Sequence, residues 1–193
     1  MEIFYKELKL TLPDDVYPPA EDSYMLADAA YAAGEVLEIG CGSGLVSLCW
    51  AKQNNVTAID INPGAIECCR ENARKNHLKI NFFESDLFSR VSGKFDAILF
   101  NPPYLPTSDE EKLQGELNKA YDGGKDGRQI LGRFLDEFSS YLKPDGSLFL
   151  IQSSLNNYDQ TISRLQELGF RAETLDKQEF FFEKLYLIRA SRS

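Results

Sequence analysis

The chain has 193 residues, of which 43% are hydrophobic and 12% aromatic, so it can bury a full core and indicates a single domain over residues 1–193. Its 21 basic and 30 acidic residues give a formal net charge of −9, which disfavours a free polynucleotide and suits a protein substrate better. The sequence lacks an apolar run long enough to cross a membrane and a secretion signal, so we expect a cytoplasmic protein.

The cysteines argue against a metal site. Cys41, Cys49, Cys68 and Cys69 form no C-x-x-C pair, and His77 is the only histidine in the chain. We therefore expect no bound metal and interpret the cysteines as buried, reduced thiols.

Strand and helix patterns alternate along the chain, which predicts a mostly parallel sheet with helices on both faces. In the first half we expect a strand pair within 3–12, a helix over 21–32, a strand over 36–39, a helix from residue 45, a strand over 56–61, a helix over 63–76 capped by Asn62, and strands over 80–83 and 95–100. In the second half we expect a helix over 128–142, a turn at 143–146, a strand over 147–152, a helix over 158–168, and a closing hairpin of strands over 170–175 and 180–189. The polar stretch 107–119 is interpreted as a lid over the substrate.

A glycine loop follows the strand over 36–39. The run 40–44 reads Gly-Cys-Gly-Ser-Gly, and its glycines allow the backbone to approach a ligand closely. The next apolar strand carries Asp60 at its end, and an acid in this place can accept both hydroxyl groups of a ribose. Strand, loop, helix, strand and terminal acid in this order predict a nucleoside cofactor site, although the spacing differs from the dinucleotide fingerprint.

A second motif, Asn101-Pro102-Pro103-Tyr104, follows the strand over 95–100. The Asn101 side chain and the Pro102 carbonyl can each accept a hydrogen from an NH2 group, while the Tyr104 ring covers the planar group being held. The motif therefore favours recognition of an amide or an amino-purine. A simple Pro-Pro turn after a strand is the structural alternative.

These two motifs together resemble those of the class I S-adenosylmethionine-dependent methyltransferases, and among them the HemK-like protein-glutamine N5-methyltransferases. The resemblance implies a Rossmann-like fold, mostly a parallel seven-stranded sheet with a C-terminal antiparallel hairpin, and S-adenosylmethionine as the cofactor. The cofactor-binding residues that it implies are Ser23, Glu38, Gly40, Gly42, Gly44, Asp60, Asp86, Leu87 and Asn101. The catalytic residues that it implies are Asn101, Pro102, Pro103 and Tyr104.

Two further segments narrow the resemblance. Residues 17–23, Tyr-Pro-Pro-Ala-Glu-Asp-Ser, resemble a stretch of the archaeal and eukaryotic branch that modifies a class 1 translation release factor, and residues 1–34 would complete the cofactor site. Residues 121–128 resemble the Gly-Gly-x-x-Gly segment of HemK-like enzymes. The implied reaction is N5-methylation of a glutamine in the factor's Gly-Gly-Gln loop.

Other interpretations stay open at this point. An N6-adenine or N2-guanine methyltransferase acting on RNA or DNA would carry a similar Asn-Pro-Pro-Tyr motif, and a scaffold that binds cofactor without catalysis is a third possibility. Glu38 could simply cap a backbone N–H group, and Glu21 and Asp22 could cap the first helix.

A hydrophobic strand suggests a protein partner. Ile80, Phe82 and Phe83 lie in the short strand that the family places at the edge of the sheet. The resembling archaeal and eukaryotic enzymes bind a small zinc-ribbon activator protein along such an edge. The alternative is that these side chains pack against the neighbouring helices of the same chain.

Overall fold

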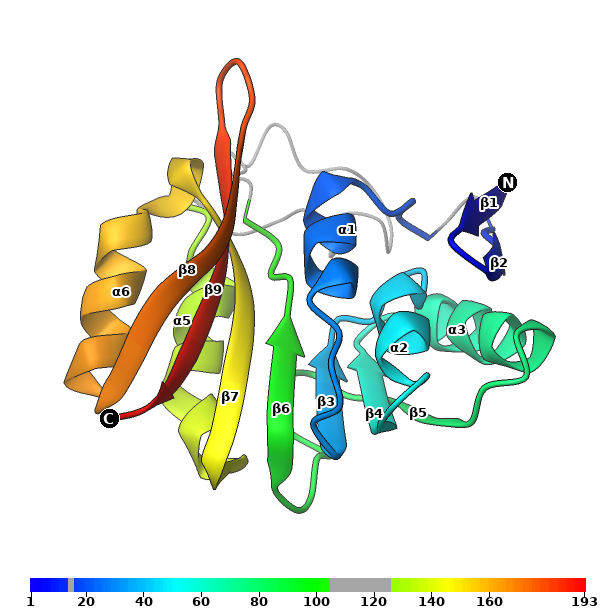
Figure 1. Ribbon diagram of the computed structural model, residues 1–193, viewed down its shortest axis with the longest axis horizontal. Coiled ribbons are helices and arrows are strands. Elements are labelled where there is room, and N and C mark those ends of the chain that lie inside the picture. The colour runs from blue at the N-terminus through cyan, green and yellow to red at the C-terminus, as the bar shows by residue number, and fades with distance from the viewer. Residues whose placement is uncertain (14–15, 105–125) are drawn as a thin grey trace.

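A seven-stranded sheet with the order β5-β4-β3-β6-β7-β9-β8 forms the centre of the computed structural model (Figure 1). The structure describes residues 1–13, 16–104 and 126–193. The strands are β3 (Glu35–Ile39), β4 (Asn55–Asp60), β5 (Ile80–Glu84), β6 (Phe95–Phe100), β7 (Leu142–Ser153), β8 (Phe170–Glu179) and β9 (Lys184–Arg192). The first five pair in parallel, whereas β9 pairs antiparallel with both β7 and β8. The predicted mostly parallel sheet with a closing hairpin is confirmed.

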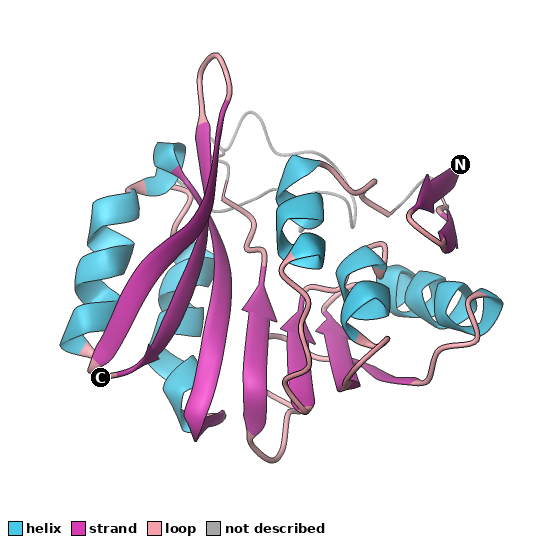
Figure 2. Cartoon of the chain, in the orientation of Figure 1, coloured by secondary structure: helices cyan, strands magenta, loops and turns pink. Residues whose placement is uncertain are grey.

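Helices cover both faces of this sheet, as Figure 2 shows. They are α1 (Glu21–Asp28), α2 (Leu45–Trp50), α3 (Pro63–Lys75), α5 (Gln129–Glu137) and α6 (Tyr158–Glu167). The Asn62 side chain accepts a hydrogen bond from the Gly64 N–H group at 2.8 Å, which confirms Asn62 as the cap of α3. Two short 3-10 turns, η1 (Phe138–Ser140) and η2 (Ser154–Asn156), also lie within the described residues.

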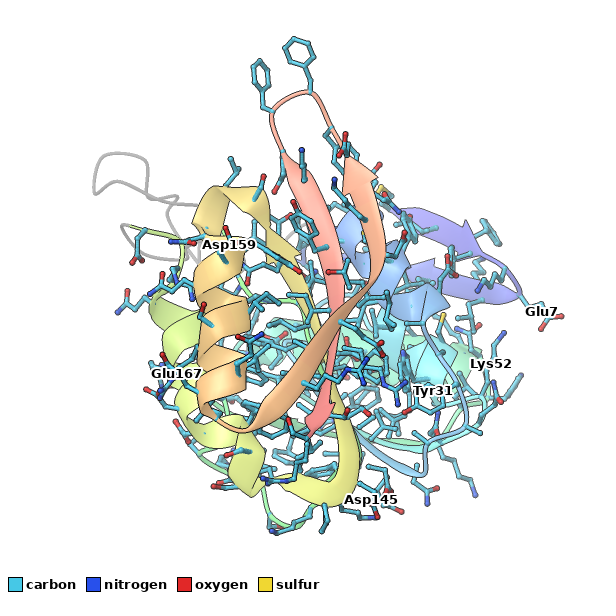
Figure 3. The ribbon with its side chains drawn as sticks, turned by 60° about the vertical axis from the view of Figure 1, so that its left-hand side comes forward. Glu7, Tyr31, Lys52, Asp145, Asp159 and Glu167 are labelled. Atoms are coloured by element: carbon cyan, nitrogen blue, oxygen red, sulfur yellow. The ribbon has the colours of Figure 1, made fainter. Side chains whose placement is uncertain are left out.

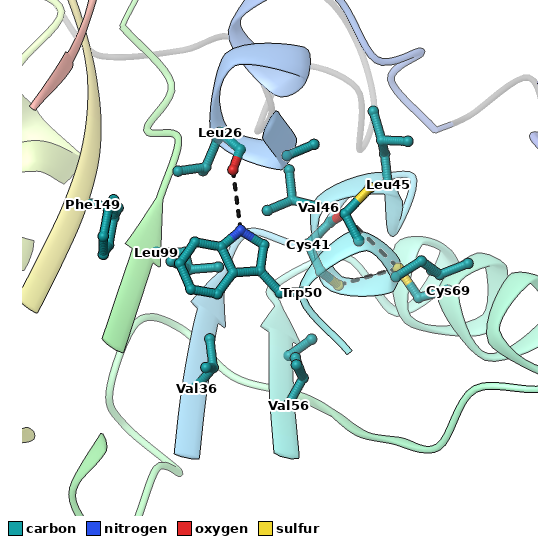
Figure 4. Packing of buried hydrophobic residues seen from close by; sticks show 14 of the residues in the cluster. Leu26, Val36, Cys41, Leu45, Val46, Trp50, Val56, Cys69, Leu99 and Phe149 are labelled. Atoms are coloured by element: carbon teal, nitrogen blue, oxygen red, sulfur yellow. Dashed lines mark hydrogen bonds between the residues drawn. The ribbon is translucent and has the colours of Figure 1, made fainter. Parts of the chain in front are cut away.

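Successive side chains of each central strand point to opposite faces of the sheet, and each face has its own hydrophobic core. On one face the sheet packs against α1, α2 and α3, and on the other against α5 and α6. Trp50 lies at the centre of the first core, where its indole N–H donates to the Leu26 carbonyl at 3.1 Å (Figure 4). A strand buried on both faces must be apolar along its length, which explains the continuous hydrophobic runs of β3 and β6. All four cysteines are buried, reduced thiols, as predicted.

The N-terminal strand pair is also confirmed. β1 (Glu2–Tyr5) and β2 (Leu8–Thr11) form an antiparallel sheet of their own beside α3 (Figure 1). The Asn72 side chain accepts from the Thr11 N–H group at 2.8 Å, and Asn76 both accepts from and donates to the Lys9 backbone. These bonds join residues far apart in the sequence, so the small sheet is fixed to α3.

The helix predicted over 21–32 is four residues shorter, because α1 ends at Asp28. The Asn54 side chain accepts from the N–H groups of Ala33 and Gly34 at 2.6 and 2.9 Å and donates to the Tyr31 carbonyl at 2.8 Å. This tertiary hydrogen bonding draws the alanine-rich stretch out of the helix. Local helix propensity is overridden here by side-chain contacts that no local pattern encodes.

The helix predicted over 128–142 and the turn at 143–146 are both corrected. The helix α5 ends at Glu137, and β7 already begins at Leu142, opposite Phe95. The Pro-Asp-Gly sequence lies inside β7, where the register shifts between Phe95 and Ala97. A Cβ atom on Gly146 would lie 2.9 Å from the Phe95 carbonyl oxygen, so glycine permits the close approach of the strands. The turn signal marks an irregularity within a strand.

The strand β5 lies at one edge of the sheet, as the resemblance implies. Phe82 is buried, and Ile80 and Phe83 pack against the two cores, so packing accounts for these hydrophobic side chains. The Phe82 and Glu84 carbonyl groups accept from Arg70 and Arg90 at 2.9 and 3.0 Å.

Two further points concern the predicted lid and the membrane. The proposed lid over 107–119 lies outside the described residues. Within the ranges described above, none of the helices is both long and apolar enough to pass through a lipid bilayer.

Candidate active site

The carboxyl ends of three adjacent parallel strands bring the two motifs together. Ile39 at the end of β3 is paired with Ile59 on β4 and with Phe100 on β6. The glycine loop directly follows β3, Asp60 is the last residue of β4, and Asn101 directly follows β6, so they meet at one edge of the sheet. This is the edge at which open α/β sheets bind their ligands.

The glycine loop has an open side and a packed side. Gly40, Gly42 and Gly44 have φ angles of 72°, 48° and 83°, a region that disfavours other residues. A Cβ atom on Gly40 or Gly42 would meet no described heavy atom within 4 Å, whereas one on Gly44 would lie 3.0 Å from the Cys69 sulfur. The first two glycines therefore present bare backbone to a ligand, and the third permits helix packing.

Asp60 fixes the shape of this loop. Its Oδ2 accepts from the Gly42 N–H group and its Oδ1 from the Asn62 N–H group, both at 2.9 Å. A carboxylate has about four lone-pair sites, which is the kind of acceptor that the vicinal hydroxyl groups of a ribose require. Its position at the end of β4 thus lets this acid order the loop at the place where a nucleoside would bind.

Glu38 lies buried at the end of β3 and accepts a hydrogen bond from the Ser47 hydroxyl group of α2. Burial raises the pKa of the Glu38 carboxyl group to about 8, and the nearby negative charge of Asp60 acts in the same direction. The Ser47 hydrogen bond opposes the shift. This acid therefore joins a strand to a helix, which is more than the backbone cap considered from the sequence.

The segment after β5 reaches the same edge. The Ser85 N–H group donates to the Asp60 carbonyl at 2.9 Å, and Ser85 Oγ donates to the Leu87 carbonyl at 2.8 Å. Leu87 is buried with a φ angle of 44°, and the Asp86 carboxylate forms an ion pair of 2.9 Å with Arg133 of α5. The sequence suggested the place of Asp86 and Leu87 but not the Arg133 contact.

The acceptor side of the site is built on the motif that follows β6. The Asn101 side-chain oxygen is buried and has no hydrogen-bond partner among the described residues. Pro102 is buried beside it. Leaving a buried acceptor unpaired costs about 1–3 kcal/mol, so this oxygen is suited to a ligand that brings an N–H donor.

Asp22 is a site residue that the sequence analysis considered only as a helix cap. One carboxylate oxygen accepts from the Ser23 N–H group at 2.6 Å and from the Ser23 hydroxyl group at 3.2 Å, and the other accepts from the Tyr104 hydroxyl group at 3.2 Å. Asp22 therefore satisfies an N–H group in the first turn of α1 and links that helix to the acceptor motif. Its place directly before Ser23 was the signal that could have identified it.

The Tyr104 hydroxyl group remains protonated. Burial raises its pKa far above the usual value, and the negative charges of Asp22 and Glu183 contribute to the same effect. Tyr104 thus acts as a hydrogen-bond donor to Asp22 and is unsuited to accept a proton at neutral pH.

Gly127, in the described part of the glycine-rich segment 121–128, lies against the Asn101–Tyr104 motif. Its φ angle is 68°, and a Cβ atom there would lie 2.4 Å from the Tyr104 carbonyl oxygen. The Gly127 carbonyl accepts from the Asn156 side chain at 3.0 Å, and Arg128 donates to the Asn157 carbonyl at 3.0 Å. The sequence analysis gave this segment only as a resemblance and did not predict the contact with Tyr104. Residues 121–125 lie outside the described part of the chain.

The residues present fit S-adenosylmethionine as the group to be bound. Open space lies before the backbone of Gly40 and Gly42, and the Asp60 carboxylate stands at the end of the adjacent strand. The buried oxygen of Asn101 follows the strand on the other side. Cofactor residues and acceptor residues therefore occupy neighbouring strand ends.

Comparison with known proteins decides the family. The family model described as the methyltransferase small domain matches residues 23–181. The chain belongs to this methyltransferase family. It is an enzyme that uses S-adenosylmethionine, as the motifs implied.

Relatives of this methyltransferase share most of its length. It is 48% identical over 196 residues to a Methanocaldococcus jannaschii protein named "Putative protein N5-glutamine methyltransferase", with 100% of both chains covered. It is 34% identical to the Mus musculus protein named methyltransferase HEMK2, covering 93% of this chain and 91% of that one. A Geobacter sulfurreducens release factor glutamine methyltransferase is 31% identical, with 84% of this chain and 62% of the relative covered.

Solved structures share the fold of this methyltransferase. The E. cuniculi Mtq2–Trm112 complex, described as responsible for methylation of the eRF1 termination factor, matches with a TM-score of 0.76 and 28% identity. The match covers 93% of this chain and 99% of that one. Methanocaldococcus jannaschii Trm5, solved with adenosine, matches with a TM-score of 0.70 and 16% identity over 99% of this chain and 54% of that one, which shows the shared class I fold.

Proposed function

We propose that the chain transfers a methyl group from S-adenosylmethionine to N5 of the glutamine in the Gly-Gly-Gln loop of a class 1 translation release factor. The observation that carries the proposal is the buried side-chain oxygen of Asn101, directly after β6, which has no hydrogen-bond partner within the described parts of the chain. An amide N–H group is the donor that such an oxygen would accept. The names of the archaeal and bacterial relatives support glutamine as the acceptor.

The chemistry divides between cofactor and protein. When bound, S-adenosylmethionine supplies a methyl group on a positively charged sulfur, which is already electrophilic. The amide nitrogen is a poor nucleophile because its lone pair is delocalised into the carbonyl group. We therefore assign to the protein the task of positioning and polarising this nitrogen.

Three residues would perform that task. The Asn101 oxygen and the Pro102 carbonyl accept the two N–H groups of the glutamine, which draws electron density onto nitrogen and fixes its orientation. The Tyr104 ring covers the amide plane, and its hydroxyl group is held by Asp22. Pro103 keeps the backbone of the motif rigid. With Tyr104 held protonated, the proton released from the amide passes to solvent or to the acceptor protein.

The cofactor would be held by the opposite half of the site. We assign the methionine end to Ser23, Glu38 and Gly40, the ribose to Asp60, and the adenine to Asp86 and Leu87. Gly42 supports this arrangement because its N–H group orients the Asp60 carboxylate. Residues 1–34 would complete the site through α1, and the reaction would take place in the cytoplasm.

A small zinc-ribbon activator protein is the partner that we propose along β5. The E. cuniculi relative, solved as a complex with Trm112, supports the presence of a second protein. Arg70 and Arg90 occupy the Phe82 and Glu84 carbonyl groups in the structure of this chain. A partner that pairs with the backbone of β5 would have to displace both arginine side chains.

The test is transfer of labelled methyl from S-adenosylmethionine to purified release factor, with total RNA in a parallel reaction. The factor is compared with a variant in which the glutamine of the Gly-Gly-Gln loop is alanine, with and without the activator protein. Label in the wild-type factor and none in the variant is the expected result. Label in RNA alone would assign the site to adenine or guanine instead, and label in neither despite cofactor binding would contradict catalysis.

A further inference from the structure

Three successive phenylalanines form an exposed turn between β8 and β9. The exposed fractions of Phe180, Phe181 and Phe182 are 42%, 91% and 84%. The turn projects beyond the carboxyl ends of β3, β4 and β6, and it stands clear of the rest of the ribbon (Figures 1 and 3). Aromatic side chains gathered in this way mark a contact with another molecule more often than a folding requirement.

Hydrogen bonds hold the base of the turn. The Phe180 N–H group donates to the Glu183 carbonyl at 2.7 Å, and the Ser153 hydroxyl group donates to the Glu183 side chain at 2.6 Å. The Lys184 N–H group donates to the Ser154 hydroxyl group at 3.0 Å. A turn whose base is fixed in this way loses less conformational entropy when it binds than an unbonded loop would, which favours a contact site.

The base of this turn adjoins the acceptor side of the active site. Leu185, directly after Lys184, belongs to the core cluster against which Tyr104 packs. The Glu183 carboxylate lies close enough to contribute to the raised pKa of Tyr104. A molecule held by Asn101 and Tyr104 can therefore extend to the turn.

The contact area of the turn and the charges at its base indicate which kind of molecule it binds. An aromatic side chain buries about 150–250 Å², whereas a specific interface needs about 800 Å² on each partner. The turn must therefore act together with a second contact, and the acceptor motif at the base of β9 provides one. Lys177 and Lys184 pair with Glu179 at 2.5 and 3.5 Å, and Glu183 lies beside Lys184, so the base of the turn carries no excess of positive charge to attract an anionic lipid surface.

We propose that the turn 180–182 docks the methyl-acceptor protein, entering an apolar depression on that protein while its glutamine occupies the Asn101 site. This inference rests on the proposed function and extends it, because it assigns the recognition of the folded acceptor to a surface outside the catalytic motif. A short peptide that carries only the Gly-Gly-Gln loop would not reach the turn.

The experiment compares the wild-type chain with the double variant Phe181→Ser, Phe182→Ser, with whole release factor and with a short Gly-Gly-Gln peptide as acceptors. The variant is expected to raise KM for the whole factor about tenfold or more. Its kcat, its KM for the peptide and its affinity for S-adenosylmethionine are expected to stay unchanged. The matched control is Phe4→Ser, which removes a 71% exposed phenylalanine on β1 and is expected to change none of these values.

The outcomes separate docking from catalysis. An unchanged KM for the whole factor, with active wild-type enzyme, would contradict docking while leaving the proposed function in place. If the wild-type chain, assayed together with the activator protein, methylated neither acceptor, the proposed function would fail and docking with it. A concentration-dependent dimer in sedimentation, or binding to lipid vesicles, that is lost in the double variant would overturn the proposal in favour of a second copy or a membrane.

Discussion

The cofactor half and the acceptor half of the site differ in how far their polar groups are satisfied within the protein. In the cofactor half, the Asp60 carboxylate already accepts two backbone N–H groups and holds the glycine loop in shape. In the acceptor half, the buried Asn101 oxygen lacks a partner among the described residues. The difference indicates that the first half is preformed for binding, whereas the second reserves a hydrogen bond for the reacting group.

The largest effect is expected from Asn101→Ala, which removes the reserved acceptor. We expect kcat for release factor to fall about 100-fold or more, by analogy with loss of one oxyanion-hole contact. The dissociation constant of S-adenosylmethionine should change less than about threefold, because the contact acts mainly in the transition state. Rapid-quench kinetics and calorimetry measure the two quantities. A loss confined to cofactor affinity would reverse the assignment of the two halves.

A smaller effect, located in the other half, is expected from Asp60→Ala. The variant loses the charge that orders the loop and the acceptors for the ribose, and hydrogen bonds to a charged group contribute about 1.5–3 kcal/mol. We expect cofactor affinity to fall about tenfold to hundredfold. Turnover at saturating cofactor should fall much less. Equal losses in kcat and affinity would show that the two halves are not separable.

Gly127→Ala tests the packing that supports the acceptor motif. The new Cβ atom would lie 2.4 Å from the Tyr104 carbonyl oxygen in a left-handed backbone conformation, so Tyr104 must move. We expect kcat/KM for the acceptor to fall about tenfold with unchanged cofactor affinity. Gly132→Ala is the matched control, because a Cβ atom in that part of α5 meets open space. Equal activity of the two variants would exclude the packing role.

Among these variants, Glu38→Gln is expected to have the smallest effect on turnover. Its main effect is expected on the free energy of unfolding. The folded pKa of about 8 exceeds the ordinary value of 4.5, so the folded state holds more protons than the unfolded state between these pH values. The free energy of unfolding of the wild type therefore decreases as pH rises from about 5 to 8. Relative to the glutamine variant, the decrease should be on the order of 1–3 kcal/mol. Urea denaturation at pH 5.5 and pH 8 measures the difference, and parallel curves for the two proteins would contradict the shift.

The sequence predicted those parts of the fold that local patterns encode. Apolar runs marked the central strands, and Asn62 before Pro63 marked the start of α3, because caps and strand periodicity depend on neighbouring residues. The end of α1 was predicted four residues too late. The Asn54 side chain, distant in sequence, accepts hydrogen bonds from the N–H groups of Ala33 and Gly34, and these bonds hold the chain outside the helix. The Pro-Asp-Gly sequence was predicted to form a turn between a helix and a strand, but it lies within β7, because Leu142 already pairs with Phe95 of the neighbouring strand.

The same distinction applies to the site. The glycine loop, Asp60 and Asn101 were predicted because each lies at the end of its own strand, and parallel strands place their ends together. The sequence did not predict that Asp22 and Gly127 lie against Tyr104, because these contacts join segments that are far apart in the chain. That the Asn101 oxygen has no hydrogen-bond partner in the described structure is likewise a property of the packed chain, which no sequence motif predicts.

The most direct test of glutamine methylation at the Asn101 site is tandem mass spectrometry of release factor incubated with the enzyme and S-adenosylmethionine carrying a deuterated methyl group. The account predicts the label on the side-chain nitrogen of the glutamine in the Gly-Gly-Gln loop, and its loss with Asn101→Ala enzyme that still binds cofactor. Label on another residue, or undiminished label with the variant enzyme, would contradict it.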